Sequence, residues 1–205
     1  MYRQNILTLV AMAMLMLFSG CSLQNKVPPT SKYLLKVRDD NTVAAAQGCQ
    51  EKVLRIGLVE SPILLNTNDI VYETDSGRSY SYTRARWMAT VNEQLSNLLI
   101  RSITRQKMFK DVIALKSYAK NDLLLESSIY AFSQTIHEDG SSTLSISVKF
   151  VLLEQYRRNI VASKLVELER KDVEGSVEGA VQGYSKMADE LLNAVNLFLN
   201  TSCEQ

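Results

Sequence analysis

The sequence predicts an α+β fold, in which a single domain contains a largely antiparallel sheet with a long strand meander and two long amphipathic helices packed on it. Two patterns lead to this prediction. Extended runs in the second half of the chain alternate apolar and polar residues, as strands with one buried face do. Two other segments repeat their apolar residues every three or four positions, which is the period of a helix buried along one side. At 205 residues with 46% apolar content, the chain has material for one good core.

The first part of the domain is predicted to contain short strands. Lys32–Val37 is a short strand candidate, and Val53–Val59 is a core strand. Pro62 ends that strand, because proline has no N–H for the ladder. Ile70–Tyr82 is predicted to form a small exposed hairpin that turns at Asp75-Ser76-Gly77, whose residue types suit a tight turn.

One amphipathic helix is predicted over Thr83–Lys107, because its apolar residues, from Trp87 through Val91 and Leu95, share one helical face. A short strand over Val112–Leu115 follows.

The second half is predicted to be a meander of three long strands and a final helix. The strands cover residues 123–137, 143–153 and 160–169, and the first two are joined through Asp139-Gly140, a strong signal for a tight hairpin turn. The charge run that follows, residues 167–174, is interpreted as a solvated strand end and loop. The last helix extends from Val177 to Phe198, and its apolar stripe is interpreted as packing against the sheet.

The N-terminus is predicted to be a signal peptide. Arg3 precedes the apolar run Ile6–Phe18, which is shorter than the roughly 20 residues that span a bilayer. The run ends in Ser19-Gly20-Cys21, and this pattern resembles a bacterial lipobox. We therefore expect residues 1–20 to be removed and Cys21 to carry an N-acyl diacylglycerol group. An ordinary secretory leader with an incidental Cys21, or a short uncleaved anchor, is the alternative.

The expected domain organisation is a lipidated cysteine and tether over residues 21–31 and a folded domain over residues 32–205. The tether contains Pro28-Pro29, and its ten residues after Cys21 reach at most about 33 Å. Lipoproteins without Asp after the lipidated cysteine are usually sorted to the outer membrane. Because Ser22 occupies this position, we expect an anchor on the periplasmic face of the outer membrane.

Two cysteines remain after lipidation, Cys49 and Cys203. An even pair in an oxidising periplasm favours a disulfide, and two unpaired thiols are the alternative.

Composition and motifs exclude several classes of function. Removal of the leader takes away Arg3, one of 23 basic residues, and leaves 22 basic residues against 22 acidic ones. This balance predicts no nucleic-acid partner. The sequence has a single histidine, His137, no cysteine pair at metal-ligand spacing and no phosphate-binding glycine loop. We therefore expect no metal site, no cofactor and no enzymatic activity.

Several short motifs are similar to the ABC-type transport auxiliary lipoproteins, which include the paraquat-inducible protein C group. The similarity covers most of the mature chain and depends mainly on the order of the motifs. In addition to the lipobox, the sequence has Tyr33-Leu34-Leu35, Ile56-Gly57-Leu58-Val59, Pro62-Ile63-Leu64-Leu65, Ile70-Val71-Tyr72, Tyr80 with Tyr82, and Arg86-Trp87. The family often has Pro-x-Tyr-Leu where this chain has Pro62-Ile63-Leu64-Leu65. Leu64 stands in place of the family's tyrosine, so the resemblance carries over no role for that tyrosine.

The resemblance implies a non-catalytic component of a transport system that moves lipids or other hydrophobic molecules. The implied partner is a mammalian-cell-entry (MCE) domain protein, and assembly into a homo-oligomer is compatible with it. The alternatives are a structural or regulatory envelope lipoprotein that activates a cell-wall synthase or supports outer-membrane assembly, and a lipid-binding module that acts alone.

A docking surface is predicted where an apolar loop lies close to tyrosines in the sequence, because aromatic residues are enriched at interfaces. For Trp87 and Leu65, burial in the core is the alternative. The predicted surface consists of Pro62, Ile63, Leu64, Leu65, Tyr80, Tyr82 and Trp87.

Overall fold

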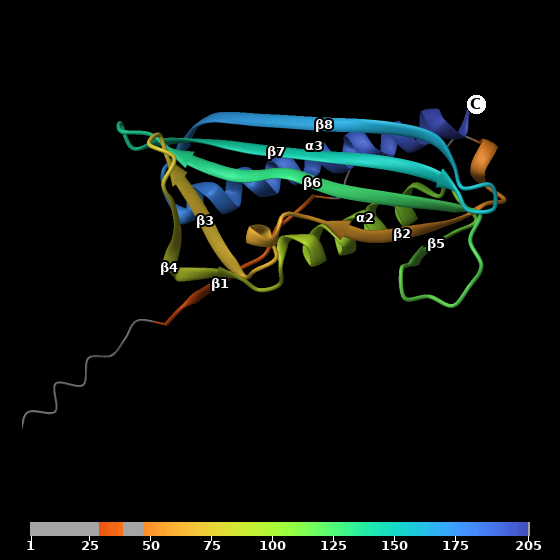
Figure 1. The fold of residues 1–205 in the computed structure, drawn as a ribbon, viewed down its shortest axis with the longest axis horizontal. Helices are drawn as coiled ribbons and strands as arrows, with labels where there is room; N and C mark the ends of the chain where they lie inside the picture. Colours follow the sequence, from red (N-terminus) through yellow and green to blue (C-terminus); the bar gives the residue numbers. More distant parts are fainter. Residues whose placement is uncertain (1–28, 39–46, 205) are drawn as a thin grey trace, which may run out of the picture.

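The computed structural model describes residues 29–38 and 47–204, so the predicted signal peptide and Cys21 lie outside the described residues. Within them, eight strands form one mixed sheet and two long helices pack against it, which confirms the predicted α+β fold (Figure 1).

The elements follow the chain in a simple order. The strands are β1 (Ser31–Tyr33), β2 (Val53–Glu60), β3 (Asp69–Thr74), β4 (Ser79–Trp87), β5 (Asp111–Ala114), β6 (Leu123–Ile136), β7 (Ser141–Glu154) and β8 (Asn159–Glu174). The helices are α2 (Val91–Gln106) and α3 (Val177–Cys203), with short 3-10 turns η1 (Gln47–Cys49) and η2 (Ile63–Leu65).

The predicted meander β6–β7–β8 forms the longest part of the sheet. Strand β6 pairs antiparallel with β7 from Leu123↔Glu154 to Ile136↔Ser142, and β7 pairs antiparallel with β8 over a similar length. Gly140, at a φ of 84°, completes the β6–β7 turn in a conformation that glycine adopts without steric cost.

The other edge of β6 is shared by two strands. Strand β2 runs parallel to the first part of β6 and ends its pairing at Glu60↔Ser128. Strand β3 then pairs with the far end of β6, from Glu73↔Thr135. Between these pairings the chain leaves the sheet through η2, so residues 129–134 of β6 have no strand partner on this edge. We call this region, residues 61–68 and 129–134, the sheet fork.

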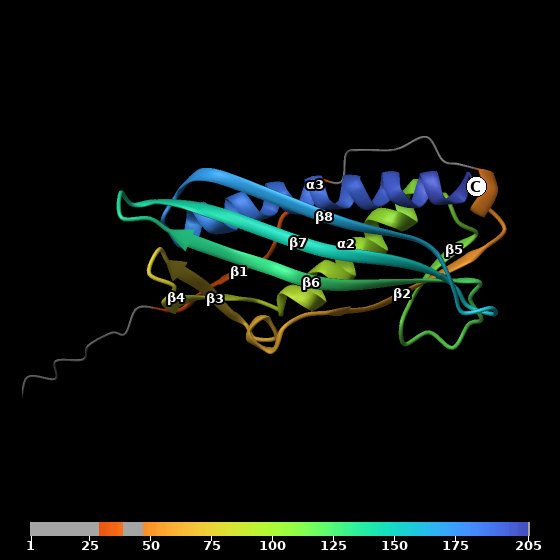
Figure 2. The same ribbon diagram turned by 45° about the horizontal axis from the view of Figure 1, so that its top comes forward.

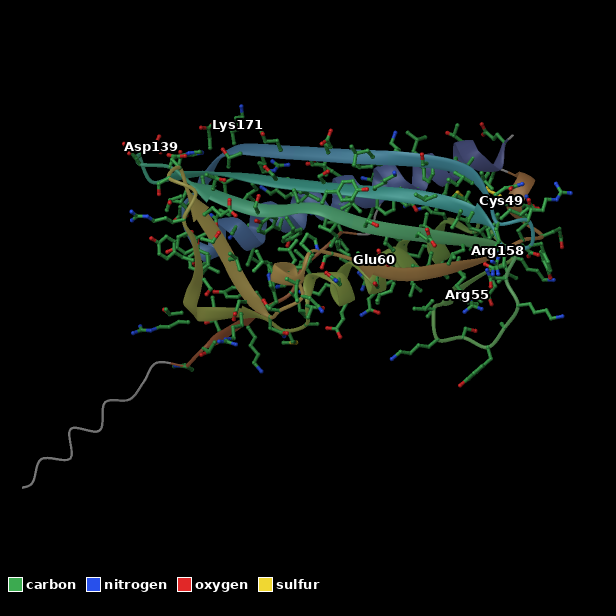
Figure 3. The ribbon with its side chains drawn as sticks, viewed as in Figure 1. Cys49, Arg55, Glu60, Asp139, Arg158 and Lys171 are labelled. Carbon is green, nitrogen blue, oxygen red and sulfur yellow. A yellow bond between two sulfur atoms is a disulfide. The ribbon has the colours of Figure 1, made fainter. Side chains whose placement is uncertain are left out.

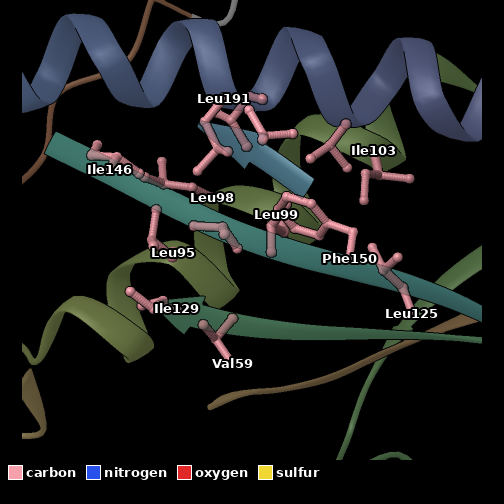
Figure 4. Close-up of a cluster of buried hydrophobic side chains, with 14 of the residues drawn as sticks. Val59, Leu95, Leu98, Leu99, Ile103, Leu125, Ile129, Ile146, Phe150 and Leu191 are labelled. Carbon is pink, nitrogen blue, oxygen red and sulfur yellow. The ribbon is translucent and has the colours of Figure 1, made fainter. Parts of the chain in front are cut away.

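Both helices cover the same face of the sheet, as the two views in Figures 1 and 2 show together. Helix α3 packs against β7 and β8, while α2 packs against β2, β5 and α3. Leucine and isoleucine side chains from α2, α3 and the strands meet in the core between these layers (Figure 4). The buried Asn196 Nδ2 of α3 donates a hydrogen bond of 2.9 Å to Ser102 Oγ of α2, which satisfies a polar group within this core.

The long helix begins later than predicted, because residues 83–87 belong to strand β4. Trp87 is the register partner of Tyr33 in β1, and its backbone N–H donates to the carbonyl of Asn68. Thr90 then caps α2: its Oγ1 accepts from Glu93 N, and the Glu93 carboxylate accepts from Thr90 N. This capping box fixes the start of the helix at Val91.

Two predicted boundaries also change. Strand β1 ends at Tyr33, because the following residues instead bond to α3: Lys36 N donates to Ser185 Oγ and Arg38 N to Asp189 Oδ1. Strand β8 continues to Glu174, so the charge run over residues 167–174 is strand and not a loop. The pairing with β7 continues to Glu174, so the chain stays extended here while most of the charged side chains reach solvent.

Candidate functional site

The sheet fork contains a cavity of about 320 Å³. One wall is the loop that links β2 to β3, and the other is the unpaired stretch of β6. Most of its lining is apolar or aromatic, and the lining residues are Pro62, Leu64, Leu65, Val71, Tyr72, Glu73, Ser79, Tyr130, Ala131, Phe132, Ser133 and Gln134. Its volume lies at the lower end of the range for small-molecule pockets.

The loop at the fork exposes apolar side chains. Ile63 is 85% exposed and Leu64 is 75% exposed, although both are large aliphatic residues. Leu65, the next residue, packs against the core and holds the turn in place. Exposed aliphatic residues held on an ordered turn are typical of a surface that is covered by a partner.

Three tyrosines of β3 and β4 form a cluster, and one of them, Tyr72, lines the cavity. The Tyr72 ring stacks on Tyr80 with 5.6 Å between ring centroids and contacts Tyr82 at 4.8 Å. Tyr82 Oη donates a hydrogen bond of 3.0 Å to Oε1 of the fully buried Gln134. Burial raises the pKa of Tyr82 to about 12, and the nearby Tyr72 adds to this effect, so the hydroxyl stays neutral and continues to donate.

Trp87 is buried in the core and does not belong to the predicted docking surface. Only 3% of its surface is exposed, and its ring lies 6.4 Å from Phe132 and 6.3 Å from Tyr184. The structure therefore brings Pro62, Leu64 and Leu65 together around one cavity and links Tyr80 and Tyr82 to it through Tyr72. Trp87 lies in the core.

Sequence reasoning missed Tyr72, Tyr130 and Phe132, which also line the cavity. Tyr130 is 57% exposed and sits at a bulge in β6, between Ile129 and Ala131. Its residue type in a strand gave a weak signal, but its nearness to the loop depends on parallel pairings between distant segments, which local patterns do not reveal.

Cys49 and Cys203 form a disulfide with Cα atoms 5.4 Å apart, which ties η1 to the end of α3 (Figure 3). Both cysteines are buried. Gly48 lies against the Cys203 carbonyl, where any Cβ atom would clash with backbone. The neighbour of Cys49 therefore has to be glycine for the helix end to approach this closely.

His137 has specific partners at the end of the sheet. Its Nδ1 lies 2.8 Å from Asp75 Oδ1 and its Nε2 lies 2.9 Å from Thr143 Oγ1. These contacts join the β3–β4 turn to the β6–β7 hairpin.

In the described part of the chain, no cluster of His, Cys, Asp or Glu is arranged to hold a metal ion. The described helices also include none that is long and apolar enough to cross a membrane.

The chain belongs to a family of transport lipoproteins. The profile of the ABC-type transport auxiliary lipoprotein component family matches residues 33–196, nearly the whole described domain. This confirms the resemblance stated from the sequence motifs. The family is an auxiliary component of transport and not a catalytic one. No curated protein matches the sequence closely enough to count as a relative.

Solved structures share the fold. Protein XCC0632 from Xanthomonas campestris, of the DUF330 family, aligns with a TM-score of 0.74 at 13% identity and covers 84% of this chain and 96% of its own. A second structure, of an uncharacterised protein, aligns with a TM-score of 0.63 at 17% identity over 84% of this chain and 99% of its own. At these identities the likeness establishes the fold alone.

Proposed function

We propose that this protein is the non-catalytic auxiliary subunit of an ABC/MCE-type transport system for lipids or other hydrophobic molecules. It is anchored through lipidated Cys21 on the periplasmic face of the outer membrane, and it docks an MCE-domain protein at the sheet fork. The family match over residues 33–196 carries the transport assignment. The exposed aliphatic loop at the fork supports docking as the mode of action.

The fork suits a protein partner for two physical reasons. Removing Ile63 and Leu64 from water on docking is favourable, at about 25 cal/mol per Å² of buried apolar surface. In addition, the backbone of residues 129–134 offers hydrogen-bonding groups on an edge that no strand of the described chain covers. An extended segment of the partner is able to use both features at once.

The test is a site-specific crosslink in the intact envelope. A photo-crosslinking amino acid replaces Leu64 at the fork, and in a control strain it replaces Leu165, which is 47% exposed on β8. We expect an MCE-domain protein to be captured from position 64 and not from position 165. Capture of cell-wall synthases or assembly factors alone would overturn the proposal in favour of the envelope-regulator alternative.

Substitutions at the fork give a second readout. We expect Leu64→Asp combined with Tyr80→Ala to weaken MCE-protein binding by at least tenfold, because residues at the centre of an interface commonly contribute 1–2 kcal/mol or more each. Leu165→Asp is the matched control, and we expect it to bind as the wild type does. Equal binding by both variants would show that the docking surface lies outside the sheet fork.

A further inference from the structure

The outward face of the β1–β4 strand pair is basic. The parallel register places Lys32 beside Arg86, and Arg84 lies on the same side two residues earlier. Ala85 and Trp87 alternate with these arginines and are buried, so the three cations point away from the core. We call Lys32, Arg84 and Arg86 the basic strand face.

Exposed apolar side chains accompany these charges. Leu34 follows β1 and is 42% exposed, while Met88 follows β4 and is 55% exposed. Cations mixed with single exposed aliphatic residues are typical of surfaces that lie at the headgroup level of a membrane.

The carboxylates of neighbouring elements leave this positive charge largely uncompensated. Asp69 pairs with Arg86 at 3.3 Å, and Glu178 accepts a hydrogen bond from the Tyr33 hydroxyl at 2.8 Å. Within the described residues, Lys32 and Arg84 have no ion-pair partner. Lys36, Arg38 and Lys186 continue the positive charge along the adjoining groove beside α3, where Asp189 accepts from the Arg38 backbone.

The chain length before β1 links this face to the lipid anchor. Eight residue steps separate Cys21 from Pro29, which corresponds to at most about 29 Å of extended chain. Strand β1 begins at Ser31, at the same end of the molecule as β4 (Figure 1). This end is therefore the part of the domain that the tether brings closest to the bilayer.

We propose that the basic strand face binds the anionic headgroup surface of the membrane in which Cys21 is anchored. The proposal rests on the lipid anchor in the proposed function and adds an orientation to it. Each lysine or arginine near an anionic surface raises affinity about fivefold. Tethering turns this weak attraction into an intramolecular contact, because the anchored domain samples the surface at high effective concentration. Bound in this way, the domain directs its opposite end, which carries Arg55 and Arg158, away from the bilayer (Figure 3).

The test uses the lipidated mature chain and two kinds of vesicle, pure phosphatidylcholine and phosphatidylcholine with 30% phosphatidylglycerol. Flotation measures binding to the vesicles. A fluorescent amino acid at Met88, which is 55% exposed directly after β4, reports contact with a quencher attached to the lipid headgroups. We expect flotation with both vesicles, and quenching at least fivefold greater with phosphatidylglycerol that disappears in 0.5 M salt.

Charge reversal separates this face from the rest of the molecule. Lys32→Glu with Arg84→Glu is expected to reduce the quenching to the level in pure phosphatidylcholine without changing flotation. The matched control, Lys116→Glu with Arg157→Glu, reverses two exposed charges in the β5–β6 loop and the β7–β8 turn and should quench like the wild type.

The outcomes distinguish the two proposals. One outcome is flotation with quenching that is equal in both kinds of vesicle, or that is unchanged by charge reversal at Lys32 and Arg84. This outcome overturns the proposal for the basic strand face and leaves the anchor intact. Flotation only with anionic vesicles, lost on charge reversal, supports the face and counts against the anchor. No flotation with either vesicle overturns both.

Discussion

At the scale of single residues, Gln134 organises the polar interior beside the sheet fork. It is fully buried, yet its Oε1 accepts from the Tyr82 hydroxyl and its Nε2 donates to Ser142 Oγ at 2.9 Å. The Ser142 hydroxyl in turn donates to the Val173 carbonyl of β8. A chain of hydrogen bonds therefore runs from the tyrosine cluster to the last strand, and removing one member leaves another without a partner.

Tyr82→Phe is expected to lower the free energy of unfolding by about 1–2 kcal/mol, because Gln134 Oε1 would remain buried without a donor. Urea unfolding monitored by circular dichroism measures this loss. Tyr80→Phe is the control: Tyr80 is 44% exposed, and no hydrogen bond of its hydroxyl is seen among the described residues. A similar loss in both variants would mean that the hydrogen bond from Tyr82 to Gln134 is not its cause.

The same tyrosine predicts a dependence on alkaline pH. Burial raises the pKa of Tyr82 to about 12 and also raises the pKa of Tyr184, whereas an unfolded tyrosine has a pKa near 10. Above pH 10 the unfolded chain therefore loses these protons before the folded chain does. The stabilisation is complete below pH 10 and is lost as the pH rises toward 12.

We therefore expect unfolding free energies measured at pH 9, 10 and 11 to fall beyond pH 10. The fall should be shallower in Tyr82→Phe, which loses the contribution of Tyr82 and keeps those of Tyr184 and of Tyr33, whose pKa is raised by its hydrogen bond to Glu178. Equal slopes in the wild type and the variant would contradict the assignment to Tyr82.

At the scale of elements, Arg55 of β2 fixes the loop between β5 and β6. Its guanidinium donates to the carbonyls of Ala114, Leu115, Ser117 and Ala119 and, through Nε, to Asn121 Oδ1, at distances of 2.6–3.2 Å. The planar guanidinium presents five donors in a fixed geometry, which allows one side chain to hold the whole loop. Tyr118, at the tip of the loop, is fully exposed.

Arg55→Lys is expected to speed tryptic cleavage after Lys116 and Lys120 by about tenfold or more, because losing one charge-assisted hydrogen bond costs about 1.5 kcal/mol or more. Limited proteolysis followed by mass spectrometry locates the cuts. Arg78→Lys, in the exposed β3–β4 turn, is the matched control. Unchanged cleavage of the loop in Arg55→Lys would show that other contacts hold it.

Local patterns in the sequence predicted most of these elements, but not their parallel pairings. The hairpin turn at Asp139-Gly140 and the apolar stripe from Val177 fix neighbouring structure, so the meander and the last helix follow directly from them. The predicted start of the first helix was wrong, because the four-residue spacing from Trp87 to Val91 suits one helix face, although Trp87 is the last residue of a strand. The sheet fork required knowing that β2 and β3 both pair with β6, and such contacts between distant segments leave no local periodicity.

At the scale of the whole molecule, the Cys49–Cys203 disulfide closes a loop with a sequence separation of 154 residues. It joins the segment before β2 to the last turn of α3, so nearly all of the sheet and both helices lie within the loop. On the chain-entropy account, a loop of this length stabilises the fold by up to about 5 kcal/mol.

Reduction with a phosphine is therefore expected to lower the free energy of unfolding by about 3–5 kcal/mol, measured by urea unfolding with and without the reductant. The double variant Cys49→Ser with Cys203→Ser provides the control, and it should unfold at one urea concentration under both conditions. If the wild type is equally insensitive to the reductant, the bond contributes nothing to stability.

The same disulfide decides how mechanical force passes through the protein. A pull applied between the N-terminal segment and the C-terminus travels along the chain to Cys49, crosses the sulfur–sulfur bond and leaves at Cys203. Strand β1 and residues 34–38 lie on that path before Cys49, so the pull loads their contacts with β4 and α3. Strands β2–β8 and both helices lie within the disulfide loop and are bypassed. A transport complex that strains against the tether of this subunit would therefore separate β1 from β4 first, while the sheet fork, which lies within the disulfide loop, keeps its shape.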